Sequence, residues 1–380
     1  MQFKTILGQT QFKKNIVRLI KEHQLPHAMM LAGPEGSGNL PMALAMAQYI
    51  NCKNKTDDDS CGTCPSCMKI EKLQHPDVHF SFPTIRKENA SKPPISNDFI
   101  LSFREFFLKY PYGNDQDWLK FLKHEKQGNI TADECRSIIQ KLQMRSYESE
   151  YKVFIMWYPE YLGNEGNILL KLIEEPTPKT ILLFVSTQPE KVLATIQSRT
   201  QLFNLDKIQT EELQQYLVQT KHVPLEKALQ IARIAEGNIN YAQKLVDEDT
   251  HDYLIWLKDW LNAMYTNNGI AISDWVADKA AFSKEQIKQF LNYTLQLFEH
   301  LVRIKYLGLA KLPLLDDEKR VIDLLLQKNV DEWAIEKCQQ ELDNTLYYIE
   351  RNANVKITLH ALSLHIQLIL LSKRKQALAT

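Results

Sequence analysis

One glycine-rich segment of the chain reads Gly33-Pro34-Glu35-Gly36-Ser37-Gly38-Asn39-Leu40. An apolar run precedes it at residues 28–32, and a run of good helix formers follows at residues 41–49. A strand, a glycine-rich turn and a helix in this order form the usual setting of a phosphate-binding loop. In the working pattern, G-x-x-x-x-G-K-[ST], backbone N–H groups surround the phosphates, the lysine neutralises them and the hydroxyl holds Mg²⁺.

The charged part of this loop is missing. Gly33 and Gly38 keep the spacing, but Asn39 stands at the lysine position and Leu40 at the hydroxyl position. Such a loop lacks both the cation for the phosphates and the ligand for Mg²⁺, so we expect no bound ATP. An ordinary strand–turn–helix, in which the glycines only form the turn, would contain the same two glycines.

A second loss lies further along the chain, after the apolar run at residues 151–157. In nucleoside triphosphatases an acidic pair at the end of such a strand serves Mg²⁺ and the attacking water. Here Met156, Trp157 and Tyr158 stand at that place, and the first acid is Glu160. The two losses are independent, and both argue against hydrolysis.

Continuous apolar runs indicate the architecture. Residues 151–157 and 180–186 show no polar alternation, which is typical of strands buried on both faces in a parallel sheet covered by helices. Residues 167–175 are expected to form a helix that Pro176 ends. The fold class expected is therefore α/β, with helices on both faces of the sheet.

Length, charge and hydropathy limit the classes of protein to which the chain can belong. The chain has 380 residues, which is enough for two or three domains. Its 46 Lys and Arg residues balance 46 Asp and Glu residues, so a strongly basic nucleic-acid-binding protein is not indicated. No apolar run approaches the roughly 18 residues of a membrane span, and the start lacks a signal-peptide core, so we expect a cytoplasmic protein. The expected domains are an α/β domain at 1–206, a helical lid at 207–250 and an all-α domain at 251–380.

Four of the six cysteines are clustered, at Cys52, Cys61, Cys64 and Cys67. Two C-x2-C spacings let pairs of thiolates bind one ion, and four thiolates complete a tetrahedral structural zinc site. Because four protein ligands leave no open position, the expected Zn²⁺ is structural, and buried thiols are the alternative. Cys338 stands apart, on an apolar helical stripe, and is expected in a core.

Residues 83–129 differ in character from the rest and are interpreted as an insertion with one or two short helices. Aromatic residues are frequent there beside lysine and arginine. Such residues could stack on nucleic-acid bases, or they could pack the insertion against the main domain, which is the interpretation we favour.

Several segments, taken together and in order, resemble the clamp-loader subunits of the AAA+ class. They are His27-Ala28, the four-cysteine module, His75-Pro76-Asp77, Asn167-x-Leu169-Leu170-Lys171-x-x-Glu174-Glu175-Pro176 and Thr195-Ile196-x-Ser198-Arg199. The resemblance covers residues 1–250 well and the remainder in helical character. It implies an AAA+ P-loop-type parallel sheet with a helical lid, followed by an all-α collar domain that holds a ring together.

Within that family, the loss of the loop lysine and of the acidic pair resembles the delta-prime subunits of bacterial DNA polymerase III. This resemblance implies a non-hydrolysing member of a hetero-pentameric ring with ATP-binding and delta-type subunits. The ring loads the sliding clamp onto primed DNA as part of the DNA polymerase III holoenzyme. The ATP-binding relatives also carry a lid arginine near the position of Asn240.

The resemblance assigns a role to Ser198-Arg199-Thr200, which matches a Ser-Arg-Cys motif with threonine in place of cysteine. Arg199 would be an arginine finger that reaches a neighbour's ATP site, with Ser198 beside it. A planar guanidinium suits the charge that develops on the γ-phosphate. From spacing alone, Arg199 could equally bind a local carboxylate.

Two other functions are considered. The first is an active ATPase of the same fold with a divergent loop, against which Asn39 and Leu40 both argue. The second is a zinc-containing nucleic-acid-binding protein that works alone. It would bind DNA in a strongly salt-dependent way, and the zero net charge argues against it.

Overall fold

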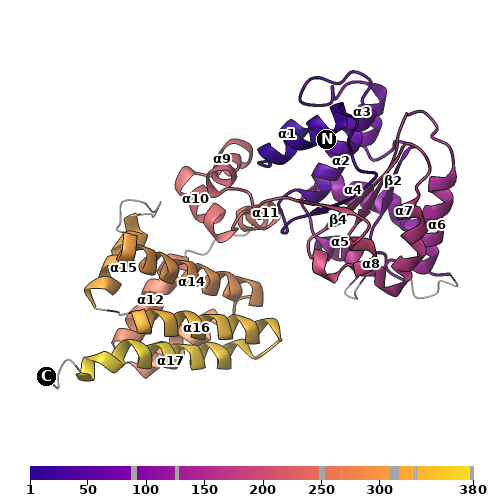
Figure 1. Cartoon of the computed structure of the whole chain (residues 1–380). Coiled ribbons are helices and arrows are strands. Elements are labelled where there is room, and N and C mark those ends of the chain that lie inside the picture. Colours follow the sequence, from indigo (N-terminus) through magenta and orange to yellow (C-terminus); the bar gives the residue numbers. More distant parts are fainter. Residues whose placement is uncertain are drawn as a thin grey trace. The chain divides into compact units, whose positions relative to one another are not determined.

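The chain forms two compact units, residues 1–247 and residues 248–380, which are described separately (Figure 1). The computed structural model describes residues 1–86, 92–124, 128–247, 253–266, 268–307, 316–328, 330 and 332–376. None of the helices within these residues combines the length and apolarity that a bilayer crossing requires.

A five-stranded parallel sheet forms the centre of the first unit. Its strands lie in the order β2-β3-β4-β1-β5, and all four neighbouring pairs are parallel. The apolar runs at 28–32 and 180–186 become β1 and β4, so both predictions are confirmed. The strands are β1 Ala28–Ala32, β2 Val78–Ser81, β3 Lys152–Trp157, β4 Thr180–Ser186 and β5 Gln201–Asn204.

Both faces of this sheet are buried. Successive side chains of a strand point to opposite faces, and in β1 Met29 and Leu31 join one core while Ala28 and Met30 join another. The first core contains α1 Thr10–Lys21, α2 Asn39–Asn51, α3 Pro65–Glu71, α4 Ile100–Lys109 and α5 Asp115–Phe121. The second contains α6 Ala132–Gln143, the 3-10 segment η3 Pro159–Leu169, α7 Leu170–Glu174 and α8 Ala194–Gln197. The α/β prediction is thereby confirmed.

One helix is shorter than expected. The helix predicted for residues 167–175 is α-helical only in α7, and the turns before Leu170 belong to η3. Gly163 interrupts η3 with φ 54° and ψ −157°, a conformation that glycine adopts readily and other residues avoid. Three shorter 3-10 segments are η1 Phe3–Thr5, η2 Ser96–Phe99 and η4 Pro189–Lys191.

The insertion packs its aromatic residues into the first core. The rings of Phe82 and Phe103 stack with their centroids 3.9 Å apart, and Trp118 meets Phe103 edge-on at 5.5 Å. The indole N–H of Trp118 donates to the carbonyl oxygen of Pro83 at 2.7 Å. Phe103, Phe106 and Trp118 are fully buried, so they hold the insertion against the sheet and are not free to stack on bases.

A three-helix segment completes the first unit, and we call its described part, residues 207–247, the lid segment. It consists of α9 Thr210–Lys221, α10 Leu225–Ile234 and α11 Ile239–Asp247, with an apolar core of its own. The sequence predicts a helical lid at 207–250, and the last positions of that range, 248–250, lie outside the described residues.

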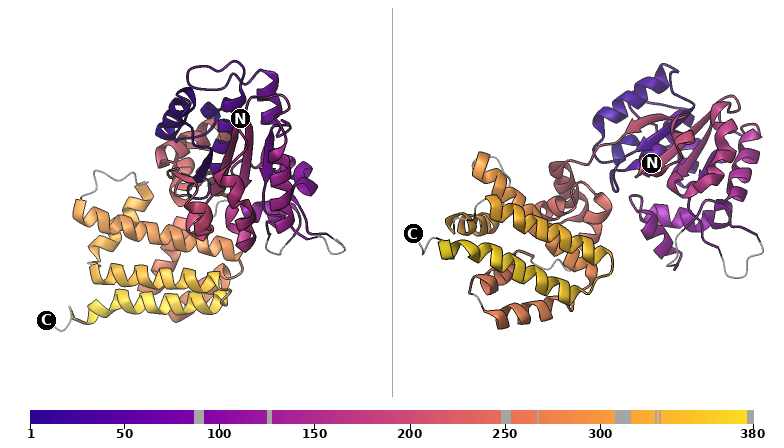
Figure 2. Two further views of the ribbon diagram at one scale, coloured as in Figure 1. Left: turned by 45° about the vertical axis from the view of Figure 1, so that its right-hand side comes forward. Right: turned by 60° about the horizontal axis from the view of Figure 1, so that its bottom comes forward.

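The described part of the second unit is entirely helical. Figure 2 shows α16 and α17 running side by side. Trp260, Cys338 and Leu342 are buried, so the prediction for Cys338 is confirmed. Ser283 and Gln286 exchange side-chain-to-backbone hydrogen bonds in a capping box ahead of α14. The helices are α12 Tyr253–Tyr265, α13 Gly269–Lys279, α14 Lys284–Leu307, α15 Asp316–Gln327, α16 Glu332–Glu350 and α17 Val355–Gln376.

Candidate functional site

The glycine-rich loop lies between β1 and α2, and its own side chains fill its interior. The Asn39 side chain donates from Nδ2 to the carbonyl oxygen of Gly33 at 2.7 Å and accepts at Oδ1 from the Ser37 hydroxyl at 2.8 Å. Asn39 is only 7% exposed, so its amide supports the loop and presents no charge to a ligand. Leu40 is buried in the core and offers no oxygen for Mg²⁺.

The carboxyl ends of β3 and β4 carry no acidic pair in the expected place. Trp157 and Tyr158 are buried, and burial raises the pKa of the Tyr158 phenol well above its usual value. Glu160 turns back to the end of β4, where one carboxylate oxygen accepts from the Ser186 hydroxyl at 2.7 Å and from the Thr187 N–H at 2.8 Å. Burial raises the pKa of Glu160. The first acid after β3 thus serves to hold a loop in place.

A small acidic pocket of about 230 Å³ lies beside these residues. Glu35, Asp115 and Glu160 line it together with Tyr158 and Tyr161, and the Tyr161 hydroxyl donates to Asp115 at 2.5 Å. Carboxylates around the loop repel the phosphates that a working loop attracts. Asp115 lies in the insertion, remote in sequence from the loop, so no local sequence pattern places it at this site.

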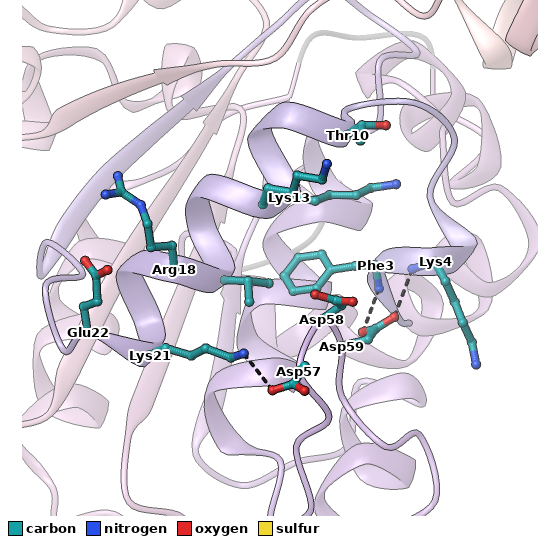
Figure 3. A pocket seen from close by; sticks show the side chains of 12 residues that line it. Phe3, Lys4, Thr10, Lys13, Arg18, Lys21, Glu22, Asp57, Asp58 and Asp59 are labelled. Atoms are coloured by element: carbon teal, nitrogen blue, oxygen red, sulfur yellow. Dashed lines mark hydrogen bonds and ion pairs between the residues drawn. The ribbon is translucent and has the colours of Figure 1, made fainter.

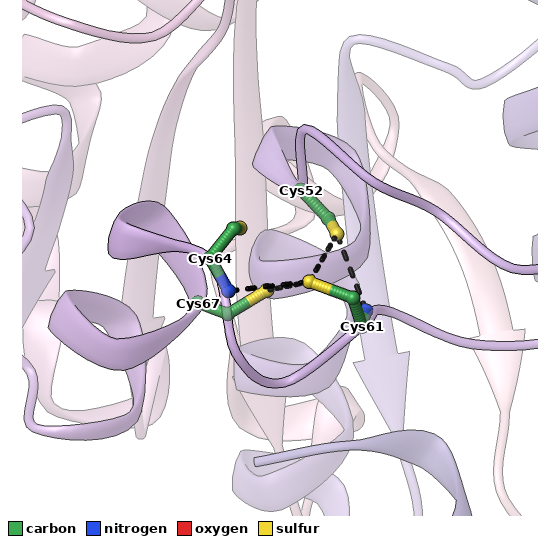
Figure 4. Close-up of side chains that lie close together, drawn as sticks. All are labelled: Cys52, Cys61, Cys64 and Cys67. Carbon is green, nitrogen blue, oxygen red and sulfur yellow. Dashed lines mark hydrogen bonds between the residues drawn. The ribbon is translucent and has the colours of Figure 1, made fainter.

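The four clustered cysteines come together as predicted. Their sulfur atoms all lie within 4.8 Å of one another (Figure 4), with Cys52 and Cys61 at 3.6 Å and Cys61 and Cys67 at 3.9 Å. Four sulfurs each about 2.3 Å from one zinc ion would lie about 3.8 Å apart. The arrangement can therefore hold a metal ion and is compatible with zinc.

Local structure explains how the short Cys61–Cys67 segment brings its sulfurs together. Gly62 has φ +74°, which lets the chain turn between the first two thiols. Pro65 opens α3, which is favourable at the first helical position. Backbone N–H groups of Cys64 and Thr63 lower the pKa of the Cys61 thiol to about 6. That thiol is prepared to bind a metal as thiolate.

The cysteine module is attached to the first helices. Asp59 accepts hydrogen bonds from the backbone N–H groups of Phe3 and Lys4, both at 3.0 Å, and Lys21 pairs with Asp57 at 3.1 Å. Figure 3 shows the groove between α1 and this acidic loop, with Lys13 among its lining residues. The lysine and arginine side chains of α1 and the aspartates at residues 57–59 line the same groove. The positive charge on this face of α1 is therefore balanced by the cysteine module itself.

Arg199 follows α8 and is bound to a local carboxylate. Its Nε donates to Glu174 at 2.5 Å, and one terminal nitrogen donates to the Thr195 carbonyl at 3.0 Å and to the Ser198 hydroxyl at 3.3 Å. About a third of the Arg199 side chain remains exposed. In the structure of the single chain, Arg199 thus binds a carboxylate of its own chain, as the alternative to the finger role expects.

The parallel sheet covered on both faces, the glycine-rich loop after β1 and the helical lid segment define a domain of the AAA+ class. A family model described as "DNA polymerase III, delta subunit" matches residues 8–209, which is more than half of the chain. The chain therefore belongs to this family, which is one of clamp-loader subunits of DNA polymerase III.

The chain is also similar to individual proteins of known name. The chain is 21% identical to "DNA polymerase III subunit delta'" of Bacillus subtilis over 95% of this chain and 96% of that protein. It is 24% identical to "DNA polymerase III subunit tau" of the same organism over 65% of this chain, which spans only 37% of that longer relative. A crystal structure of a DNA polymerase III gamma subunit-related protein from Thermotoga maritima aligns with 93% of this chain and 98% of that chain, with a TM-score of 0.38 and 13% identity.

Proposed function

We propose that this chain is a delta-prime-type subunit of the DNA polymerase III clamp loader, and that it does not hydrolyse ATP. The observation that carries this proposal is the Asn39 amide, bound to Gly33 and Ser37 where a loop lysine would face phosphates. The near full-length similarity to a delta-prime subunit supports the same subunit type.

In this proposal the chain works inside a hetero-pentameric ring with ATP-binding and delta-type subunits. The ring opens a sliding clamp and places it on primed DNA in the cytoplasm. The all-α second unit would be the collar through which the ring is held. The four cysteines would hold one structural Zn²⁺, since four protein ligands leave no position for a reacting water.

Arg199 would act on a neighbouring subunit's ATP. On assembly, its guanidinium would exchange the Glu174 carboxylate for the γ-phosphate of the neighbour's ATP. The pair with Glu174 is half-exposed, and such pairs contribute at most about 1 kcal/mol. An arginine finger is worth on the order of 10³–10⁵ in rate, so the release of Glu174 costs little by comparison.

The test is nucleotide turnover by the purified chain alone, and then in a mixture with ATP-binding clamp-loader subunits. We expect no turnover alone and DNA-stimulated turnover in the mixture. Arg199→Ala should lower turnover at the neighbour's site at least about a hundredfold, and the total rate of the mixture by the share of that site, without preventing assembly. Arg136→Ala is the matched control, because Arg136 is also an exposed arginine paired with a carboxylate, Asp133.

Two results would contradict the proposal. Turnover by the lone chain would favour the divergent active ATPase. Equal turnover by the Arg199→Ala and Arg136→Ala mixtures would remove the finger role.

A further inference from the structure

The insertion supplies a short segment, residues 110–117, that runs from the end of α4 into the start of α5, and we call it the plug. We infer that the plug occupies the place of a nucleotide at the degenerate loop and fixes the lid segment to the sheet without any ligand. This inference deepens the proposed function, because it explains how the site is kept closed, and it rests on the chain binding no ATP.

Tyr112 is the aromatic part of the plug. Its hydroxyl accepts a hydrogen bond from the backbone N–H of Leu7 at 3.3 Å. Its ring lies against the loop, so closely that a Cβ atom at Gly38 would stand 3.2 Å from it. The same side chain packs against the apolar core of the lid segment. Burial raises the pKa of its phenol to about 12.

These three neighbours define a slot. A nucleotide with its phosphates at the start of α2 would have to pass its sugar and base between the loop, the N-terminal segment around Leu7 and the lid segment. Tyr112 fills that slot with a flat ring, and it bonds to a backbone N–H there as a base could. No nucleotide can enter unless the Tyr112 side chain leaves.

Polar residues of the plug bind the loop on one side. Asn114 donates from Nδ2 to the Glu35 carboxylate at 3.1 Å. The lid segment approaches the same loop, because the Ile239 N–H donates to the Gly36 carbonyl at 3.3 Å. Gly36 has φ +71°, and a Cβ there would stand 2.8 Å from the Asn238 Cα. The loop is thus held by the plug and by the lid segment together.

On the other side, the plug binds the lid segment through Asp117. One oxygen of Asp117 accepts from the Asn240 side chain at 2.6 Å, and the other pairs with Lys244 at 2.6 Å. The Asp117 side chain is only 18% exposed, so both are charge-assisted contacts in a partly dry environment. Asn240 stands near the position where ATP-binding relatives carry a lid arginine, and here it holds an aspartate of the same chain.

The contacts of Asp117 suggest a clean perturbation from the lid side. Asp117 also caps α5 together with Asn114, so replacing Asp117 itself would disturb the insertion. The double variant Asn240→Ala, Lys244→Ala removes both lid contacts and leaves that cap intact. Lys221→Ala, an exposed lysine on α9 of the same lid segment, is the matched control.

The experiment is hydrogen exchange of the full chain, without nucleotide, followed at residues 110–117 and along α11. We expect the double variant to exchange at least about tenfold faster in both places, since each lost charge-assisted bond accounts for roughly that factor. The control should exchange like the unmodified chain. Unchanged exchange in either place would overturn the inference.

A second arm separates this inference from the proposed function. ATP added to the unmodified chain should alter exchange in neither place, because the slot is filled. A change in the plug on addition of ATP would overturn the inference even if no turnover is detected. Loss of the Arg199 effect on turnover would instead overturn the finger role and leave the plug untouched.

Discussion

Replacing Asp77 tests how much three buried hydrogen bonds beside the sheet contribute to the stability of the first unit. It lies in the turn before β2 and is 2% exposed. Its two oxygens accept backbone N–H groups of the loop before β3: Tyr147 at 2.5 Å, Glu148 at 2.8 Å and Ser149 at 2.8 Å. Asp77→Asn keeps the size of the side chain and replaces one acceptor oxygen by an NH₂ donor.

The size of the effect follows from these three bonds. Hydrogen bonds to a charged group contribute roughly 1.5–3 kcal/mol each, and neutral ones roughly 1 kcal/mol. Asparagine can accept at one oxygen position, so at least one bond is lost and the others lose their ionic part. We expect the free energy of unfolding of the first unit to fall by about 3 kcal/mol.

The pH dependence has a definite sign. Burial alone would raise the pKa of Asp77, but the three N–H donors outweigh it and lower that pKa. A carboxylate whose pKa is lowered by folding stabilises the native state above its unfolded pKa, and this stabilisation is lost as pH falls below about 4. The difference between Asp77→Asn and the unmodified chain should therefore shrink below pH 4.

Urea unfolding at pH 7 and pH 3, with hydrogen exchange at residues 147–149 as the local probe, measures both effects. Asp57→Asn is the control, because the Asp57 side chain is 98% exposed and pairs only at the surface with Lys21; it should cost less than about 1 kcal/mol. Equal losses in the two variants, or a loss in Asp77→Asn that persists undiminished at pH 3, would refute the reasoning.

Three further predictions concern the metal, the insertion and a half-buried histidine. Elemental analysis of the purified chain should find one zinc per molecule; Cys67→Ser should lose most of it while Cys135→Ser retains it, and equal zinc in both would contradict the site. Trp118→Ala should cost about 3–5 kcal/mol in urea unfolding, since Trp118 is fully buried, whereas the half-exposed Trp333→Ala should cost less than about 0.5 kcal/mol. Burial lowers the pKa of His79 to about 4, so stability should fall by about 3 kcal/mol as pH drops from about 6.5 to about 4; His79→Gln should remove this slope, and an unchanged slope would show that other groups cause it.

The architecture was largely predictable, because burial on both faces leaves a direct signature in sequence. The residues of β1, and those of β4 between Thr180 and Ser186, are all apolar and suit burial on both faces of the sheet. The cysteine cluster was predictable for a similar reason, since C-x2-C spacing constrains two sulfurs locally. The structure brings all four sulfurs together, and the identity of the metal stays a prediction.

Other features of the fold and of the site could not be predicted, chiefly because they depend on contacts between segments that are distant in the sequence or in another chain. The bond between Asn240 and Asp117 joins residues 123 positions apart, and no local pattern indicates such a pair. The helix predicted for residues 167–175 begins earlier than α7, because periodicity does not distinguish an α-helix from the 3-10 turns of η3. The finger role of Arg199 also stays a prediction, because its partner would lie in another chain.

Tyr112 belongs to the same polypeptide as the slot that it fills. This connection affects how well free ATP can compete with Tyr112 for the slot. A tethered group acts at an effective concentration set by its connection, on the order of millimolar for short flexible linkers, and α4 and α5 restrict it further. Free ATP would compete with a group that cannot diffuse away. Restoring lysine at Asn39 and threonine at Leu40 would leave this competitor in place. A return to nucleotide binding would require coordinated changes in the loop and in the insertion, which lie far apart in the sequence.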